Sequence, residues 1–306
     1  MNEWISAVRR LRRSSVQDWS FPTDDLLDEY LEILPGRPDD EVRDLLRLFL
    51  FEESGFGNDE SHLIWFWSSD EEMREVLLQK SYYRRLTNRS RRRPLPYQGI
   101  DWVLDLLPDH PSAALAAIDA YLGAHWGTMP DGRISGLLHA MAIIRVRHIG
   151  SPADAGSKQL SFHQLTSYDF ERLAAALYTS MRYATRLTPP GRDGGRDVIA
   201  SRSVLGHREE LRVQVKLHRN PVGVGVIREM LGVVADEKAN KGVVITSGTF
   251  TRGARQLATR NPRIELIRGD ELAVLLNEHF GSNWPAHLDG ILVRYRDAVI
   301  PPEGVQ

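Results

Sequence analysis

The chain has 306 residues, of which 42% are hydrophobic and 26% charged, enough for about two domains with sizeable cores. It contains no cysteine, which excludes a disulfide framework and zinc sites built from cysteine. Lys and Arg total 39 against 41 for Asp and Glu, so the net charge of −2 gives no sign of a nucleic-acid partner. No apolar run approaches the roughly 18 residues that span a bilayer, and we expect a cytoplasmic protein without membrane contact.

The charge is unevenly divided along the chain. Residues 1–160 carry 19 basic and 25 acidic side chains, whereas residues 161–306 carry 20 basic and 16 acidic ones. Six of the seven tryptophans also lie in the first half. The near-neutral total therefore hides two regions of different character.

The first half has the spacing of helices. Apolar residues recur every three or four positions in 24–31 and 41–50, and further helices are expected from residue 70, over 113–126 and over 134–148. We therefore expect an all-α domain over 1–150, with a role in recognition, oligomerisation or regulation. The small, polar residues of 151–163 predict a linker after it.

The second half changes its period to that of an α/β domain over 164–281, followed by a tail over 282–306. Ser167 can cap a first helix, and two strands, 198–200 and 211–217, form a hairpin around Gly206. Helices and strands then alternate. These later elements are expected at 226–240, 242–246, 251–259, 264–267 and 270–280.

The chemistry-bearing residues of this half lie in the loop Asp193-Gly194-Gly195-Arg196-Asp197 and the strand Gln214-Val215-Lys216. Side chains alternate along a strand, so Gln214 and Lys216 share a face, and the hairpin brings Asp197 beside them. Carboxylate and amide oxygens suit Mg²⁺, and a lysine there can orient or deprotonate a water or stabilise a phosphorane-like transition state. The alternative is structural, because Asp-Gly-Gly is a common turn and strand Gln and Lys often only face water.

Several segments in the same order resemble a known family. The resemblance rests on Phe170-Glu171-Arg172-Leu173, the Asp-Gly-Gly-Arg-Asp loop, the Gln-Val-Lys strand, the block 241–251 with Ala254, and Gly269-Asp270-Glu271-Leu272. Together they are similar to the Mrr-type restriction endonuclease domain of the PD-(D/E)XK nuclease superfamily, over about 165–281. The resemblance implies a restriction-endonuclease-like mixed sheet built in the order α-β-β-β-α-β.

The resemblance also implies roles for individual residues. Asp197 and Gln214 would be metal ligands for Mg²⁺, with Mn²⁺ as a substitute, and Lys216 the catalytic lysine. Glu171 would approach the metal from the first helix. Independently of the resemblance, basic residues near this site are expected to hold the DNA backbone, namely Arg192, Arg196 and Arg219. One departure is Leu217, since the family often has a basic residue directly after the lysine.

These observations predict a Mg²⁺-dependent endodeoxyribonuclease of restriction or antiphage-defence type, with DNA as its substrate. Because cutting both strands needs two active sites, we expect a homodimer or a larger homo-oligomer. The alternative is a nuclease-fold DNA-binding module, or an effector subunit whose helical domain binds a controlling partner protein of a defence system. Six arginines within 84–93 form either an arm that binds nucleic acid or a partner, or a solvated loop.

Overall fold

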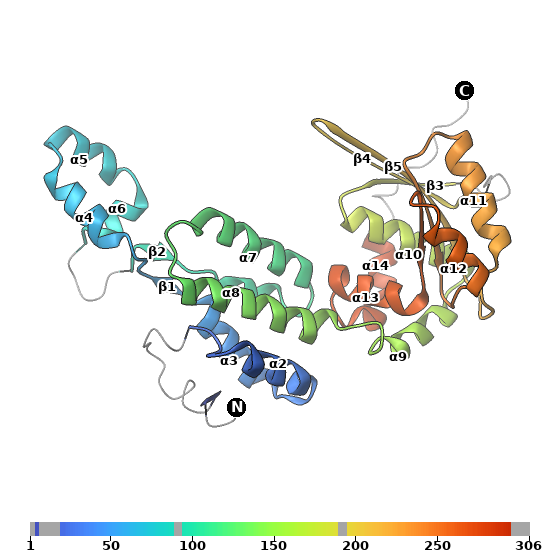
Figure 1. Cartoon of the computed structure of the whole chain (residues 1–306), viewed down its shortest axis with the longest axis horizontal. Coiled ribbons are helices and arrows are strands. Elements are labelled where there is room, and N and C mark those ends of the chain that lie inside the picture. The colour runs from blue at the N-terminus through green and yellow to red at the C-terminus, as the bar shows by residue number, and fades with distance from the viewer. Residues whose placement is uncertain (1–3, 6–18, 89–93, 189–194, 295–306) are drawn as a thin grey trace. The chain divides into compact units, whose positions relative to one another are not determined.

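The computed structural model describes residues 4–5, 19–88, 94–188 and 195–294. The chain divides into two compact units, Met1–His148 and Ile149–Gln306 (Figure 1). None of the helices in the described ranges has the length and apolar character needed to cross a membrane.

The N-terminal unit is helical around a core centred on α3. In α3 the side chains at helical spacing are buried, from Val42 through Leu45 and Leu46 to Phe49, and they pack against α8 and η3. Two-residue strands β1 and β2 form a short antiparallel ladder, which adds a little strand to the expected all-α domain. The elements are α2 (Asp24–Ile33), η2 (Leu34–Gly36), α3 (Asp39–Leu50), β1 (Glu53–Ser54), α4 (Asp59–Ser68), α5 (Glu71–Leu78), α6 (Ser81–Leu86), β2 (Tyr97–Gln98), η3 (Asp101–Leu106), α7 (Pro111–His125), α8 (Asp131–Ile144) and the π-helical turn η4 (Arg145–Ile149).

Helices α4, α5 and α6 form a small group with its own cluster of Phe66, Leu77 and Tyr83. Such a small cluster buries little apolar surface. Several large apolar side chains of α4 and α5 therefore remain exposed to solvent. They are Ile64, Trp65, Trp67, Met73, Val76 and Leu78.

The C-terminal unit is built on a five-stranded mixed sheet in the order β3-β4-β5-β6-β7. The first three strands pair antiparallel, and β5, β6 and β7 pair parallel. The elements are α9 (Gly156–Gln159), η5 (Leu160–Gln164), α10 (Ser167–Ser180), β3 (Ala184–Leu187), β4 (Val198–Val204), β5 (His207–Lys216), α11 (Val224–Asp236), β6 (Lys241–Thr246), α12 (Arg252–Thr259), β7 (Ile264–Ile267), α13 (Gly269–Phe280), η6 (Trp284–His287) and α14 (Leu288–Arg294). The expected order of one helix, three strands, a helix and a strand is confirmed.

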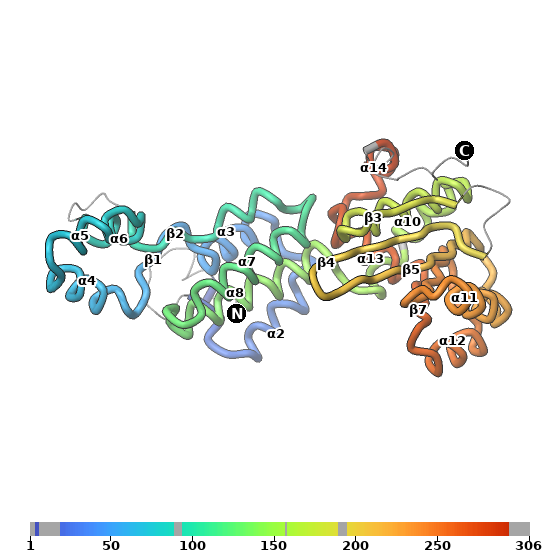
Figure 2. Tube along the Cα trace, turned by 90° about the horizontal axis from the view of Figure 1, so that it is seen from above, coloured from blue at the N-terminus to red at the C-terminus, as the bar shows by residue number. Residues whose placement is uncertain are grey.

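Helices cover both faces of this sheet. Helices α10, α13 and α14 pack on the face lined by Val198, Val213 and Val215, whereas α11 and α12 pack on the face lined by Val244 and Ile264 (Figures 1 and 2). Because side chains alternate along β5, Val213 and Val215 point to the first face and Gln214 to the second. Arg212 confirms this direction, since its Nε reaches Glu237 directly after α11.

Two segments differ from their sequence expectation. Residues 151–163, expected as a linker, contain α9 and begin η5, and Phe162 is fully buried. In the expected tail, Trp284 is also fully buried and stacks on Phe162 with ring centroids 5.4 Å apart. Burial of these two large aromatic surfaces ties both segments into the core. The cap of α10 is Thr166, one residue before the expected Ser167.

Candidate active site

Asp197 lies where the loop from Gly195 enters β4, and backbone hydrogen bonds hold it on both sides. Its N–H donates to the carbonyl of Val213 at 2.8 Å, and its own carbonyl accepts from Thr188 N at 2.9 Å. Its side-chain Oδ2 accepts from Val215 N at 2.6 Å, and the residue is only 8% exposed. Asp197 is thus hydrogen-bonded to Val213 and Val215, the two residues that flank Gln214 in β5.

Gln214 is 2% exposed, and its Oε1 accepts no hydrogen bond from any residue that the structure describes. A buried carbonyl oxygen without a donor costs about 1–3 kcal/mol relative to one that is paired. Such a group in a native protein calls for an explanation, and a bound ion is one that satisfies an oxygen acceptor. Gln214 therefore has the burial and the chemistry of a ligand for a hard cation.

Lys216 ends β5 two residues later, on the same face as Gln214, and is partly exposed. Its backbone is fixed by the neighbouring strand, because Ser247 N donates to Lys216 O at 3.1 Å. The buried Ser247 hydroxyl also accepts from His218 N at 3.0 Å and donates to His218 O at 3.2 Å. Ser247 thus supports the strand end that carries Lys216. Sequence reasoning assigned Ser247 no role, although it stands in the block that carries the family resemblance.

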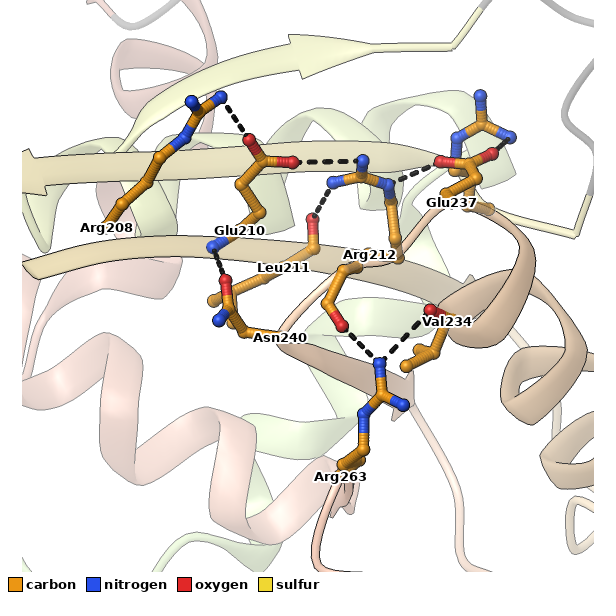
Figure 3. A network of polar contacts seen from close by, with 10 residues as sticks. Arg208, Glu210, Leu211, Arg212, Val234, Glu237, Asn240 and Arg263 are labelled. Atoms are coloured by element: carbon orange, nitrogen blue, oxygen red, sulfur yellow. Dashed lines mark hydrogen bonds and ion pairs between the residues drawn. The ribbon is translucent and has the colours of Figure 1, made fainter.

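The loop before Asp197 is anchored to α11. Gly195 has φ +79°, and a Cβ there would lie 2.9 Å from Glu229 Oε1. Beside it, Arg196 forms an ion pair with Glu237 at 2.5 Å, and the other oxygen of Glu237 accepts from Arg212 Nε at 2.5 Å. The buried Arg212 also contacts Glu210 at 3.3 Å (Figure 3). The charge of Arg196, expected to meet DNA, is therefore balanced inside the protein.

The remaining predicted site residues are Glu171, Arg219 and Arg192. Glu171 is half-buried on α10, which packs on the face of the sheet opposite to Gln214. Arg219 is exposed in the loop after β5, and Arg192 lies outside the described residues.

Part of the arginine-rich segment 84–93 makes internal contacts, because Arg85 pairs with Glu53 at 3.2 Å and Arg84 donates to carbonyls at the end of α5.

The donor set fits a hard metal ion through oxygen atoms. Within the described ranges, no three His, Cys, Asp or Glu side chains gather as they do around a protein-only metal centre. Asp197 and Gln214 supply one carboxylate and one amide oxygen, and Mg²⁺ typically takes few protein ligands with water and substrate phosphate completing its shell. The Gln214 Oε1, which has no donor among the described residues, is a suitable ligand for such an ion.

The C-terminal unit is an α/β domain with a mixed sheet, and comparison with known proteins gives a family match for it. Residues 162–276 match the Mrr_cat family, described as "Restriction endonuclease". Residues 162–276 are therefore similar to an Mrr-type restriction endonuclease domain, and the resemblance seen in the sequence is confirmed.

Two curated relatives and two solved structures are similar to parts of the chain. Over 103 residues, 33% of this chain and 26% of the relative, it is 30% identical to the uncharacterized protein y4cE of Sinorhizobium fredii (strain NBRC 101917 / NGR234). Over 87 residues, 28% of each protein, it is 37% identical to the type IV methyl-directed restriction enzyme EcoKMrr of Escherichia coli (strain K12). The matches thus span only about a quarter of either relative.

Both solved structures are 21% identical in sequence to this chain. They are the DNA modification-dependent restriction endonuclease AspBHI, with TM-score 0.40 over 48% of this chain and 41% of that one, and the MspJI restriction endonuclease in complex with a 27-mer oligonucleotide, with TM-score 0.37 over 49% and 37%.

Proposed function

We propose that the chain is an endodeoxyribonuclease of restriction type, which hydrolyses DNA phosphodiester bonds with Mg²⁺ as cofactor and Mn²⁺ as a substitute. The observation that carries this proposal is the buried Oε1 of Gln214, which has no donor among the described residues and lies beside the Asp197 carboxylate, near the end of the strand that also bears Lys216. The family of residues 162–276 supports the same reaction class.

Each residue of this group has a distinct task in the proposed hydrolysis. Asp197 and Gln214 would hold the ion, which would offset phosphate charge and lower the pKa of water bound to it. The ammonium of Lys216 donates hydrogen bonds to the phosphate oxygen on which negative charge develops, or orients the attacking water. The water oxygen bonds to phosphorus as a P–O ester bond breaks, which leaves one phosphomonoester end and one hydroxyl end. We also propose that Glu171 approaches the metal from α10, as the family resemblance implies, although α10 packs on the face of the sheet opposite to Gln214.

The basic residues divide into two groups. Arg219, exposed in the loop after β5, is suited to hold the DNA backbone, and we assign Arg192 the same role. Arg196 is held by Glu237, so it acts first by fixing the loop before Asp197 and reaches DNA only if that ion pair opens.

The biological setting we propose is defence against foreign or modified DNA in the cytoplasm of a prokaryote. Cutting both strands takes two active sites, so the proposed working form is a homodimer or a larger assembly. Sedimentation of the full chain with and without a DNA duplex measures this state directly.

The test is cleavage of supercoiled plasmid by the full chain in Mg²⁺, in Mn²⁺ and in EDTA. Because one relative is described as methyl-directed, methylated and unmethylated plasmid are compared. We expect nicked or linear product with either ion on at least one plasmid and none in EDTA. Intact plasmid under every condition would contradict the proposal.

A second candidate is an effector subunit controlled by a partner protein. The exposed apolar side chains of α4 and α5, among them Trp65 and Trp67 at 48% exposure, favour it, because such side chains in one small helical group are typical of an interaction surface. In that case the isolated chain leaves all plasmids intact and acquires cleavage activity only with the partner bound.

A further inference from the structure

Helix α12 presents an exposed basic face that the proposed reaction does not use. Residues 239–264 contain no acidic residue and five basic ones. Three of these, Arg252, Arg255 and Arg260, are exposed, and no described carboxylate pairs with them. Most other described arginines of this unit form an ion pair or donate a hydrogen bond within it. These are Arg172, Arg196, Arg202, Arg208, Arg212, Arg263 and Arg268.

This face is hollowed as well as charged. The three arginines, with Gln256 and Thr259, line a surface hollow of ≈ 410 Å³ that contains no acidic side chain. Every one of these side chains can donate hydrogen bonds, and guanidinium groups pair with phosphate in a two-pronged geometry. Unbalanced charge with convergent donors therefore favours a phosphate-bearing ligand.

The hollow lies on a helix that starts close to the candidate active site. Helix α12 begins six residues after β6 ends, and β6 pairs with the part of β5 that carries Gln214 and Lys216. The N-cap Thr251 donates its N–H to Val222 O at 3.0 Å, which ties the helix start to the loop bearing Arg219. With α11, α12 covers the face of the sheet to which Gln214 points (Figure 2).

We propose that the exposed face of α12 binds the phosphodiester backbone of the duplex DNA that the domain cleaves. This inference rests on the proposed function and adds a contact surface to it. At about 1.5 Å per residue, the eight-residue helix is long enough to face the phosphates of three or four successive nucleotides of one strand. Because the contact is with phosphate, it strengthens binding to every sequence alike.

The test measures the salt dependence of binding of the full chain to a fluorescent DNA duplex in EDTA, where no cleavage occurs. The triple variant Arg252→Gln, Arg255→Gln, Arg260→Gln is compared with a control that removes three exposed arginines elsewhere, Arg145→Gln, Arg182→Gln, Arg186→Gln. Each lost phosphate contact lowers the slope of log K against log salt by about 0.9. We expect the α12 variant to lose two to three slope units and at least about tenfold in affinity at 100 mM salt. The control should change the affinity less than about threefold.

A charge-retaining variant with lysine at the same three positions separates loss of charge from misfolding, and we expect it to keep most of the wild-type slope. Equal slopes and affinities for the α12 variant and the control would overturn the inference, even if the wild-type chain cleaves plasmid. A wild-type chain that neither binds nor cleaves duplex DNA would overturn the inference and the proposed function together.

Discussion

Gln214 is buried with an oxygen that has no donor among the described residues. This arrangement lowers the stability of the protein but leaves the oxygen available to a metal ion. The amide is 2% exposed, so its Oε1 has lost water without gaining a donor among the described residues. A protein that holds a metal-binding oxygen in its interior bears this free-energy cost whenever the metal is absent. Stability and activity should therefore respond to substitution of Gln214 in opposite directions.

We predict that Gln214→Met, which keeps the volume and removes the amide, leaves the metal-free chain as stable as wild type or about 1 kcal/mol more stable. Urea unfolding in EDTA measures this free energy. Plasmid cleavage by the Gln214→Met variant should fall at least about 100-fold, because the change removes a ligand oxygen. Gln214→Glu, which restores a hard oxygen, should retain activity above that of Gln214→Met. A Met variant that cleaves like wild type would remove Gln214 from the site.

Gly195 and Gly206 form a matched pair of turn glycines in the hairpin region. Both have positive φ, +79° and +81°, but a Cβ at Gly206 would meet nothing within 4 Å, whereas one at Gly195 would lie 2.9 Å from Glu229 Oε1. Comparing the two separates backbone strain, which both share, from the steric clash that only Gly195 adds.

We predict that Gly206→Ala lowers the free energy of unfolding by about 1 kcal/mol, the cost of φ > 0 for an L residue, and leaves cleavage unchanged. Gly195→Ala should lower that free energy further and slow cleavage, because the clash displaces the loop that ends at Asp197. Urea unfolding and plasmid nicking rates measure the two effects. Equal losses in both variants would show that α11 does not hold this loop.

Among the elements of the C-terminal unit, those with local signals were predictable from sequence, whereas strand β3 (Ala184–Leu187) was not placed. The β4–β5 hairpin around Gly206 and the buried strand β6 have local signals, a turn glycine and a short apolar run, and the structure confirms them. Local signals could not assign residues 151–163 and 282–294 to the core, because Phe162 and Trp284 are buried by contact with each other across 122 positions. The ion pair of Arg196 likewise depends on Glu237, which is distant in sequence.

At the scale of the whole molecule, the tryptophans and buried histidines of the N-terminal unit allow the stability of that unit to be followed against pH. Six of the seven tryptophans lie in residues 1–148, so tryptophan fluorescence reports mainly on that unit. Burial, followed by the nearby charge of Arg147, lowers the pKa of His148 from 6.5 to about 4. Burial also lowers the pKa of His125 and His139 in the same unit.

We predict that the N-terminal unit loses stability as the pH falls from about 6.5 to about 4. In this window the unfolded chain binds a proton at His148 and the folded chain does not, so acid favours unfolding. The shift in pKa corresponds to at most about 3 kcal/mol. Urea unfolding followed by tryptophan fluorescence at pH 4.5 and 7 should show the loss. His148→Gln should show less of it, and an identical pH dependence in the variant would contradict the assignment.

The proposed activity is tested most directly by single-turnover cleavage of plasmid in Mg²⁺ by the wild-type chain and by Lys216→Ala. Lys216 ends β5 on the face of Gln214 and is partly exposed, so its truncation is expected to leave the fold intact, which circular dichroism checks. We expect wild type to cut and Lys216→Ala to be slower by about 100-fold or more, the usual effect of removing a group that stabilises transition-state charge. Equal cleavage by the two proteins would contradict the proposed active site, and no cleavage by either would contradict the proposed function.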